Sequence, residues 1–192
     1  MSDHREETRV LIPFEQVAGN PQAWQDAAHD LIHAAGILLE AYREGETTEA
    51  PERRPPMWRT ILMLYGLAAE NLIKAIIVAK GPNPASEGKL PHWFTRHNLE
   101  RLAGQRARLH LAKSHAHLLN RLQAFVECGK YPVGIREGEG RTSFVFSEPI
   151  DINDTLQLLE YLDEELARAS GGFAPASLDL RHLRVPFGDG LM

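Results

Sequence analysis

Residues 66–81, GLAAENLIKAIIVAKG, form the stretch that decides the fold. The stretch is apolar enough for a buried helix, yet Glu70, Asn71 and Lys74 interrupt it. Glu70 and Lys74 stand at positions i and i+4, where a carboxylate and an ammonium face each other on one helix. Because a buried charge must find a partner or shift its pKa, we expect the two side chains to pair. The pair either fixes the helix against its neighbours or lines a ligand groove.

This stretch belongs to a helix that we predict to run from about Met57 to Lys80, ending at Gly81-Pro82. The helix is apolar nearly all round, which predicts burial against several neighbours and a place at the centre of the fold. Apolar residues recur at helical spacing in four further segments. These are Pro21 to about Gly45, Thr95 to Ala103, Ser114 to Cys128 and Asn153 to Ala169.

The connections predict the rest of the fold. Gly104 is expected to break the helix that precedes it. Residues 131–147, YPVGIREGEGRTSFVFS, alternate around a glycine turn and predict a small β-hairpin before the last helix. The fold class is therefore all-α with this hairpin as an insertion. We expect a single domain over residues 1–170, with its core at about 20–133, and an irregular C-terminal tail over 171–192.

The whole chain points to a soluble, cytoplasmic protein. It has 192 residues and one cysteine, Cys128, which cannot form an internal disulfide. Its first twenty residues lack the layout of a secretory signal. The apolar run around residues 61–79 is interrupted by charges, and we expect it to fall short of the roughly 18 to 20 apolar residues of a membrane span. No membrane association is predicted.

Charge is unevenly distributed along the chain. The net charge is -5, but residues 96–121 hold six basic side chains and one acid, Glu100. Such a positive stretch in an acidic chain is typical of a phosphate-binding surface. The alternative is that it pairs with the acidic segment at residues 151–165, since mixed-sign helix faces are common.

Histidines at metal-ligand spacing occur once, at His29 and His33. On a helical wheel both lie opposite the apolar stripe, so we interpret them as part of a solvated face. Nothing resembles a glycine-rich phosphate loop, a nucleophile elbow or a paired-cysteine zinc site. Neither a metal nor a cofactor is predicted.

Three stretches, taken in order, resemble a known family. They are AAENLIKAIIVAKG (residues 68–81), HNLERLA (97–103) and GKYPVG (129–134). Together they resemble the HEPN superfamily of prokaryotic all-helical domains, over roughly residues 60–133. The resemblance implies an up-and-down bundle of four to five helices and frequent homodimerisation. For many members it implies a role in RNA cleavage, toxin-antitoxin pairs or antiviral defence, while other members are catalytically silent.

Active ribonucleases of this family carry an arginine, four to six residues and then a histidine. Arg108 and His115 match that spacing, although Leu109 follows the arginine where the family usually has a polar residue. The resemblance implies that the histidine would act as general acid or base on a ribose 2'-hydroxyl. The arginine would stabilise phosphorane charge without a metal.

Six residues are candidates for a binding site: Glu70, Lys74, Arg96, His97, Lys130 and Tyr131. His97 follows Arg96 directly and is either a site residue or a structural histidine. Lys130 and Tyr131 either add a cation and a stacking ring or only end a helix. Three functions stay open: an RNA-binding or nucleotide-binding protein without proven catalysis, a metal-independent endoribonuclease, and a non-catalytic module that binds a protein partner.

Overall fold

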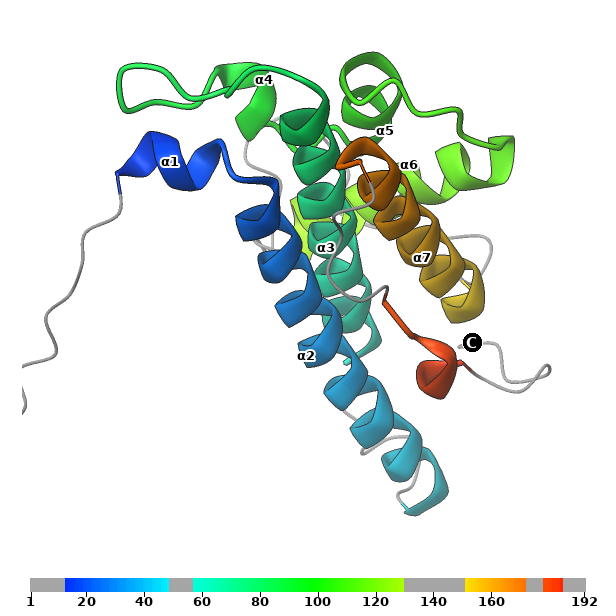
Figure 1. The fold of residues 1–192 in the computed structure, drawn as a ribbon. Helices are drawn as coiled ribbons and strands as arrows, with labels where there is room; N and C mark the ends of the chain where they lie inside the picture. The colour runs from blue at the N-terminus through cyan, green and yellow to red at the C-terminus, as the bar shows by residue number, and fades with distance from the viewer. Residues whose placement is uncertain (1–12, 49–56, 130–150, 172–177, 185–192) are drawn as a thin grey trace, which may run out of the picture.

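The described part of the chain is helical. The computed structural model describes residues 13–48, 57–129, 151–171 and 178–184 (Figure 1). Its α-helices are α1 (Phe14–Ala18), α2 (Pro21–Thr48), α3 (Trp58–Lys80), α4 (His92–Thr95), α5 (Leu99–Arg101), α6 (Lys113–Gly129) and α7 (Ile152–Ala169). A π-helix spans Leu102–Arg106, and a 3-10 helix spans Arg181–Leu183. Within these residues the only β-type pairing is an isolated bridge between Ser86 and Lys89. The all-α prediction is confirmed.

The four long helices agree with the predicted segments to within a few residues. The region between α4 and α6 differs from expectation, because the chain continues from α5 directly into the π-helix and Gly104 lies inside it. The prediction that Gly104 breaks the helix is therefore wrong. The hairpin predicted at residues 131–147 lies outside the described residues, as do Lys130 and Tyr131.

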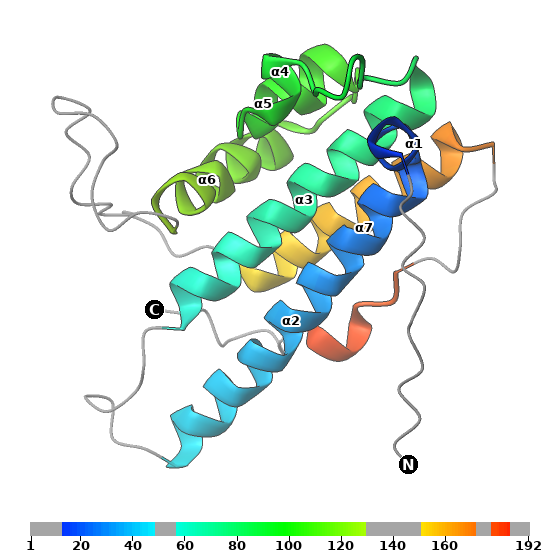
Figure 2. The ribbon, with the colours of Figure 1, turned by 90° about the vertical axis from the view of Figure 1, so that its left-hand side faces the viewer.

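Helix α3 lies at the centre of the fold. It contacts α2, α6 and α7, and Figure 2 shows it between α6 on one side and α2 on the other. Its buried side chains include Ile61, Leu62, Ile77 and Val78, which point in different directions around the helix. Three neighbours within one chain thus account for a helix that is apolar all round, and its apolarity does not require a second subunit.

The same helix passes a membrane-span test by length and composition. Within the described ranges α3 alone does so, with a mean hydropathy of 1.8 in its most apolar window, and the expectation that it falls short is wrong. Its surroundings are those of a core helix, however, because 72% of that window is buried inside the fold. Glu70 and Lys74 lie in the middle of the helix and are buried with it.

Helices α3 and α6 approach closely at Gly66. A Cβ atom at this position would lie 2.7 Å from Cγ2 of Val126 and 3.1 Å from the backbone oxygen of Leu122. A side chain here would press against the backbone of α6, which cannot move aside as a flexible side chain can. The glycine therefore sets the distance between the central helix α3 and α6.

Tyr65 carries a hydroxyl group without a hydrogen-bond partner in the part of the chain that the structure describes. The side chain is fully buried. Burial raises the pKa of Tyr65 to about 12, while the positive charge of Arg43 acts in the opposite direction. A buried hydroxyl that lost its hydrogen bonds with water on folding opposes stability.

We expect Tyr65→Phe to leave the free energy of unfolding unchanged or to raise it by up to about 1 kcal/mol, because the substitution removes an unsatisfied polar atom and keeps the ring. Urea denaturation followed by circular dichroism measures the difference. A loss of more than about 1 kcal/mol would instead show that the hydroxyl makes a hydrogen bond in solution.

Residues 178–184 lie against α2. Leu180 and Leu183 are buried, and the Arg43 Nη2 atom donates a hydrogen bond to the Leu183 carbonyl oxygen over 2.8 Å. A Cβ atom at Gly36 would lie 3.1 Å from Cδ2 of Leu183, so the glycine leaves room for this leucine. Part of the predicted irregular tail is thus a short helical turn that covers the core.

Candidate functional site

The charges inside α3 are joined by a histidine from a distant segment. Glu70 is 2% exposed and Lys74 is 7% exposed. The Lys74 Nζ atom lies 2.5 Å from Oε1 of Glu70, and the His97 Nδ1 atom lies 2.7 Å from Oε2 of Glu70. The predicted pairing of Glu70 with Lys74 is confirmed. Both carboxylate oxygens have partners, as a buried carboxylate requires.

Two aromatic rings surround the ammonium group. The Lys74 Nζ atom lies 5.4 Å from the ring centroid of Trp24 and 5.3 Å from that of Phe94. The two rings meet edge to face with their centroids 5.2 Å apart. A cation over aromatic faces is attracted by their electron density. We call Glu70, Lys74, His97, Trp24 and Phe94 the Glu70 cluster.

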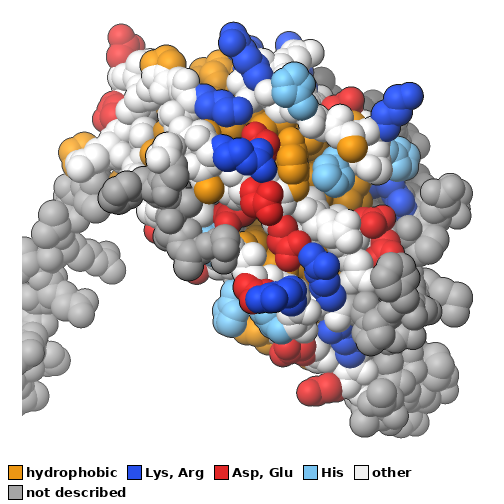
Figure 3. All heavy atoms as spheres, turned by 45° about the vertical axis from the view of Figure 1, so that its right-hand side comes forward, with side chains coloured by type: hydrophobic (Ala, Val, Ile, Leu, Met, Phe, Trp, Pro, Cys, Tyr) orange, Lys and Arg blue, Asp and Glu red, His pale blue; other side chains and the backbone are white. Residues whose placement is uncertain are grey.

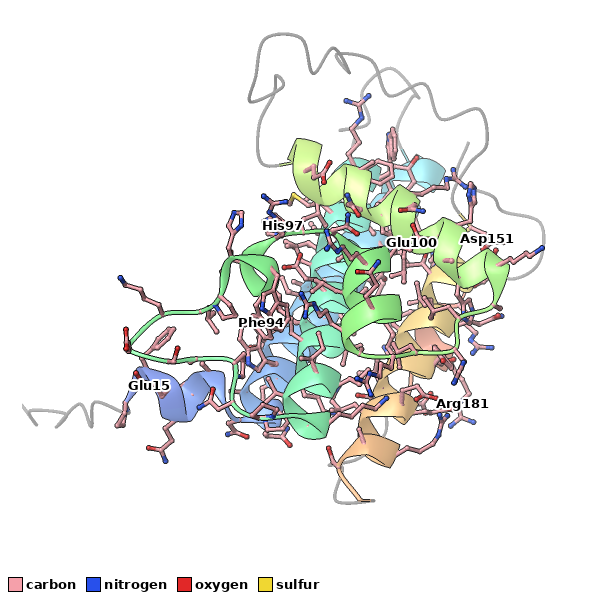
Figure 4. All side chains as sticks on the ribbon, turned by 90° about the horizontal axis from the view of Figure 1, so that it is seen from above. Glu15, Phe94, His97, Glu100, Asp151 and Arg181 are labelled. Carbon is pink, nitrogen blue, oxygen red and sulfur yellow. The ribbon has the colours of Figure 1, made fainter. Side chains whose placement is uncertain are left out.

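The segment after α4 is fixed in position by hydrogen bonds. Asn98 begins α5, and its Oδ1 atom accepts a hydrogen bond from the Arg101 backbone nitrogen over 2.9 Å. The Leu99 backbone nitrogen donates to Oε1 of Gln123 on α6 over 3.2 Å. Figure 4, seen from above, shows Phe94 of α4 and His97 on the same side of α3. This segment therefore carries both a partner of Glu70 and the residues beside it.

A surface pocket opens next to the Glu70 cluster. It has a volume of about 280 Å³, and Leu102 contributes an apolar side chain to its wall. Its polar and aromatic lining comes from His92, Trp93, Arg96, Asn98, Arg101 and Arg106. Among the residues that the structure describes, the lining includes three arginines and no carboxylate. We call this site the arginine pocket.

The three arginines make contacts with neutral groups. Arg101 Nε donates to Oε1 of Gln105 over 2.9 Å, and Arg96 Nε lies 3.4 Å from the His92 Nε2 atom. The Arg106 guanidinium carbon lies 4.4 Å from the ring centroid of Trp93. Among the described residues none of the three forms an ion pair with an acid. Their positive charges are thus not neutralised locally.

Three acids of α7 pair with arginines that lie outside the arginine pocket. Glu164 and Glu165 contact Arg168 on the same helix, and Glu160 contacts Arg184, whose Nη2 atom lies 2.5 Å from the Glu160 Oε2 atom. On the face shown in Figure 3, basic and acidic side chains lie next to one another across the middle of the surface. The alternative that the acidic segment neutralises the basic stretch is therefore wrong for the arginine pocket.

The predicted catalytic pair lies away from the lining of this pocket. Arg108 is exposed and has a φ of 52°, in the loop between the π-helix and α6. His115 lies in the first turn of α6, and its ring centroid is 5.3 Å from that of Tyr161. No hydrogen bond or ion pair joins Arg108 to His115 in the described structure, and their catalytic pairing stays a prediction.

His29 differs from its sequence interpretation. It is partly buried, and its Nε2 atom lies 3.2 Å from Oδ1 of Asp163 on α7. The assignment of His29 to a solvated face is wrong, because α7 covers that side of α2. His33 is exposed, as expected. Within the described ranges no three histidine, cysteine, aspartate or glutamate side chains come together as a metal site.

The structure thus brings together four of the six predicted binding residues. Glu70, Lys74 and His97 share one hydrogen-bonded cluster, and Arg96 lies beside His97 in the wall of the arginine pocket. Sequence reasoning missed Trp93, because a tryptophan in a short helix gives no periodic signal. Comparison with known protein families, curated proteins and solved structures finds no match for this chain.

Proposed function

We propose that this chain is a HEPN-like helical protein that binds the phosphate groups of RNA or of a nucleotide in the arginine pocket. The observation that carries the proposal is a pocket lined by Arg96, Arg101 and Arg106 without a carboxylate. Arginine presents a planar fork of donors that matches phosphate oxygens two at a time. Unneutralised cations also attract a polyanion over a distance.

The Glu70 cluster has a supporting role in this proposal. Glu70 holds the His97 ring, and the chain passes from Arg96 through His97 to Asn98. Fixing His97 to a buried carboxylate therefore orders two lining residues of the pocket before the ligand arrives. A pre-ordered site loses less conformational entropy on binding.

The resemblance supplies the wider context of the proposal. This context comprises an up-and-down bundle of four to five helices, a homodimer, and a role in a prokaryotic stress, defence or toxin-antitoxin system. The cytoplasmic location in this proposal rests instead on the single cysteine and on the first twenty residues. A non-catalytic module that binds a protein partner is the outcome favoured if the pocket binds no RNA and no nucleotide.

The proposal predicts that Arg101→Gln and Arg106→Gln each weaken binding of a short single-stranded RNA by about tenfold, because each removes a charge-assisted contact with phosphate. The slope of log affinity against log salt should also become less steep by about one for each arginine removed. Fluorescence anisotropy of a labelled RNA over a salt series measures both quantities.

Arg168→Gln is the matched control, since Arg168 is an exposed arginine that pairs with the acids of α7. We expect it to bind RNA like the parent protein. Equal losses of RNA affinity in the control and in the pocket variants would mean that overall charge, and not the pocket, causes the effect. Failure of the parent to bind both RNA and nucleoside triphosphates at low salt would overturn the proposed function.

A metal-independent endoribonuclease is the second candidate, and one contact favours it. A carboxylate on Nδ1 of a histidine fixes the orientation of the ring in known acid-base catalysts, and Glu70 stands in that position relative to His97. RNA incubated with the protein in excess EDTA tests this function, with His97→Ala and His115→Ala beside the parent. Loss of cleavage in one of the two variants would identify its histidine as the catalytic one. If the parent does not cleave RNA, binding without catalysis is the function that we propose.

A further inference from the structure

Trp93 forms an aromatic wall of the arginine pocket. Its side chain is partly exposed, and the guanidinium carbon of Arg106 lies 4.4 Å from its ring centroid. Arg106 is itself exposed. One face of the indole is therefore covered by the end of a flexible, solvent-exposed side chain.

The Trp93 ring also contacts the core. It meets the ring of Phe94 edge to face, with centroids 5.4 Å apart and an interplanar angle of 74°. Phe94 is fully buried and belongs to the Glu70 cluster. Trp93 is thus a ring anchored to the core at its edge, while one of its faces looks into a pocket with three cations.

We propose that Trp93 is the stacking platform for one unpaired base of a single-stranded RNA, and that this base takes the place of the Arg106 guanidinium on the indole. The inference rests on the proposed function and adds the class of ligand to it. The guanidinium group and a nucleobase are both flat and both stack on indole rings. The guanidinium shields the apolar face from water until a larger flat group replaces it.

The exchange also changes where the positive charge of Arg106 lies. Once a base covers Trp93, the guanidinium of Arg106 is released toward the phosphate next to that base. Arg96 and Arg101 line the same pocket and contact phosphates of the same strand. A base in a duplex is already stacked and paired, so the site should prefer single strands to duplexes.

The chain contains a matched control for this arrangement. The Arg59 guanidinium carbon lies 5.2 Å from the ring centroid of Trp58, and Trp58 meets Phe125 edge to face at 5.7 Å. The set of contacts is similar to that at Trp93, since the tryptophan contacts both an arginine and a core phenylalanine. Neither Trp58 nor Arg59 lines the arginine pocket.

The test compares Trp93→Leu with Trp58→Leu in the full chain. Three probes are titrated: a short single-stranded RNA, a strand of the same length with abasic positions, and a duplex. We expect Trp93→Leu to weaken binding of the single strand by roughly tenfold and to leave binding of the abasic strand unchanged. Trp58→Leu should bind all three probes like the parent, and the parent should bind the abasic strand more weakly than the intact strand.

The outcomes separate this inference from the proposed function. If Trp93→Leu binds the single strand like the parent while Arg101→Gln still weakens it, the stacking platform is overturned and phosphate binding stands. If the parent binds none of the probes, the stacking platform is overturned, and the proposed function falls with it if the parent also binds no nucleoside triphosphate. If Trp93→Leu fails to fold, the test is quenching of tryptophan fluorescence in the Trp58→Phe protein. We expect the intact strand to quench the fluorescence and the abasic strand to leave it unchanged. Equal quenching by the two strands would reject the stacking platform.

Discussion

Replacing Glu70 by alanine is expected to lower the free energy of unfolding by about 3 to 5 kcal/mol, the cost of leaving a buried charge without its partner. Lys74 is 7% exposed, and its Nζ atom lies 2.5 Å from Glu70. In the variant the Lys74 ammonium group retains only its contacts with the rings of Trp24 and Phe94 among the described residues. Cation–π contacts contribute about 0.5 to 2 kcal/mol and do not compensate for the lost carboxylate.

Lys74→Met provides the comparison within the same cluster. In this variant Glu70 keeps His97, whose Nδ1 atom lies 2.7 Å away, and methionine fills much of the space of lysine. We therefore expect a smaller loss than for Glu70→Ala. The double variant Glu70→Leu/Lys74→Met should also lose less than Glu70→Ala, because no unpaired charge remains on α3.

Urea denaturation followed by far-ultraviolet circular dichroism measures all three proteins. Adding the single variant Glu70→Leu completes a double-mutant cycle, which gives the coupling between the two sites. A Glu70→Ala variant as stable as the double variant would contradict a buried ion pair. RNA binding by Lys74→Met answers the question left open by the sequence. Affinity like that of the parent assigns the pair to the fold, and a loss of affinity assigns it to the ligand site.

The long helices were predictable because their signal is local. Apolar residues at helical spacing mark α2, α3, α6 and α7, and the predicted bounds lie within a few residues of the observed ones. The pairing of Glu70 with Lys74 is local for the same reason, since both lie one turn apart on α3. Each of these predictions needs only the geometry of a single helix.

The partners across the fold were not predictable in this way. A helical wheel placed His29 in solvent because it considers one helix alone. The partner of His29, Asp163, lies on another helix and is distant in sequence. His97 was recognised as a candidate, but its contact with Glu70 depends on how the segment after α4 crosses α3. The π-helix through Gly104 was not predicted either, because a glycine in a sequence signals a break.

The basic stretch was predicted as a surface and observed as a smaller site. Of its six basic residues only Arg96, Arg101 and Arg106 line the arginine pocket. These three lie around α5 and the π-helix, whereas Arg108 and the residues after it continue into a loop and α6. A count along the chain finds a positive region, and the fold decides which charges converge.

The second large effect is expected at Asp163, which joins three separate parts of the chain. The side chain is 3% exposed. Its Oδ1 atom accepts a hydrogen bond from Gln25 Nε2 over 2.7 Å and lies 3.2 Å from His29 Nε2, both on α2. Its Oδ2 atom accepts from the Leu178 backbone nitrogen over 3.1 Å. One carboxylate thus holds α7, α2 and the C-terminal segment together.

Asp163→Asn is expected to lower the free energy of unfolding by about 2 to 3 kcal/mol near neutral pH, in the range for losing hydrogen bonds to a charged group. The asparagine amide has one oxygen and one NH₂ group in place of the two carboxylate oxygens. The NH₂ group would therefore face either the Gln25 side-chain amide or the Leu178 backbone N–H, and two donors cannot form a hydrogen bond with each other. Urea denaturation measures the loss. Asp30→Asn, the same change at an exposed position inside α2, serves as the control for the chemistry of the substitution.

The pH dependence of that loss identifies the charge as its cause. Burial acts to raise the pKa of Asp163, but hydrogen bonds from His29, Leu178 and Gln25 outweigh burial and hold the pKa below its ordinary value. A group with a lowered pKa in the folded state stabilises the fold above its unfolded pKa, about 3.9 for aspartate, and loses that contribution as the pH falls through the folded pKa.

The difference in unfolding free energy between the parent and Asp163→Asn should therefore be full at about pH 5 and should shrink below about pH 4. The comparison runs from pH 5 down to the lowest pH at which both proteins fold, a range below that in which histidines ordinarily titrate. A difference that stays constant over this range would mean that shape rather than charge makes Asp163 important. In that case Asp163→Leu should lower the free energy of unfolding no more than Asp163→Asn does. If the charge of Asp163 is what matters, Asp163→Leu should lower it more, because leucine accepts no hydrogen bond from any of the three donors.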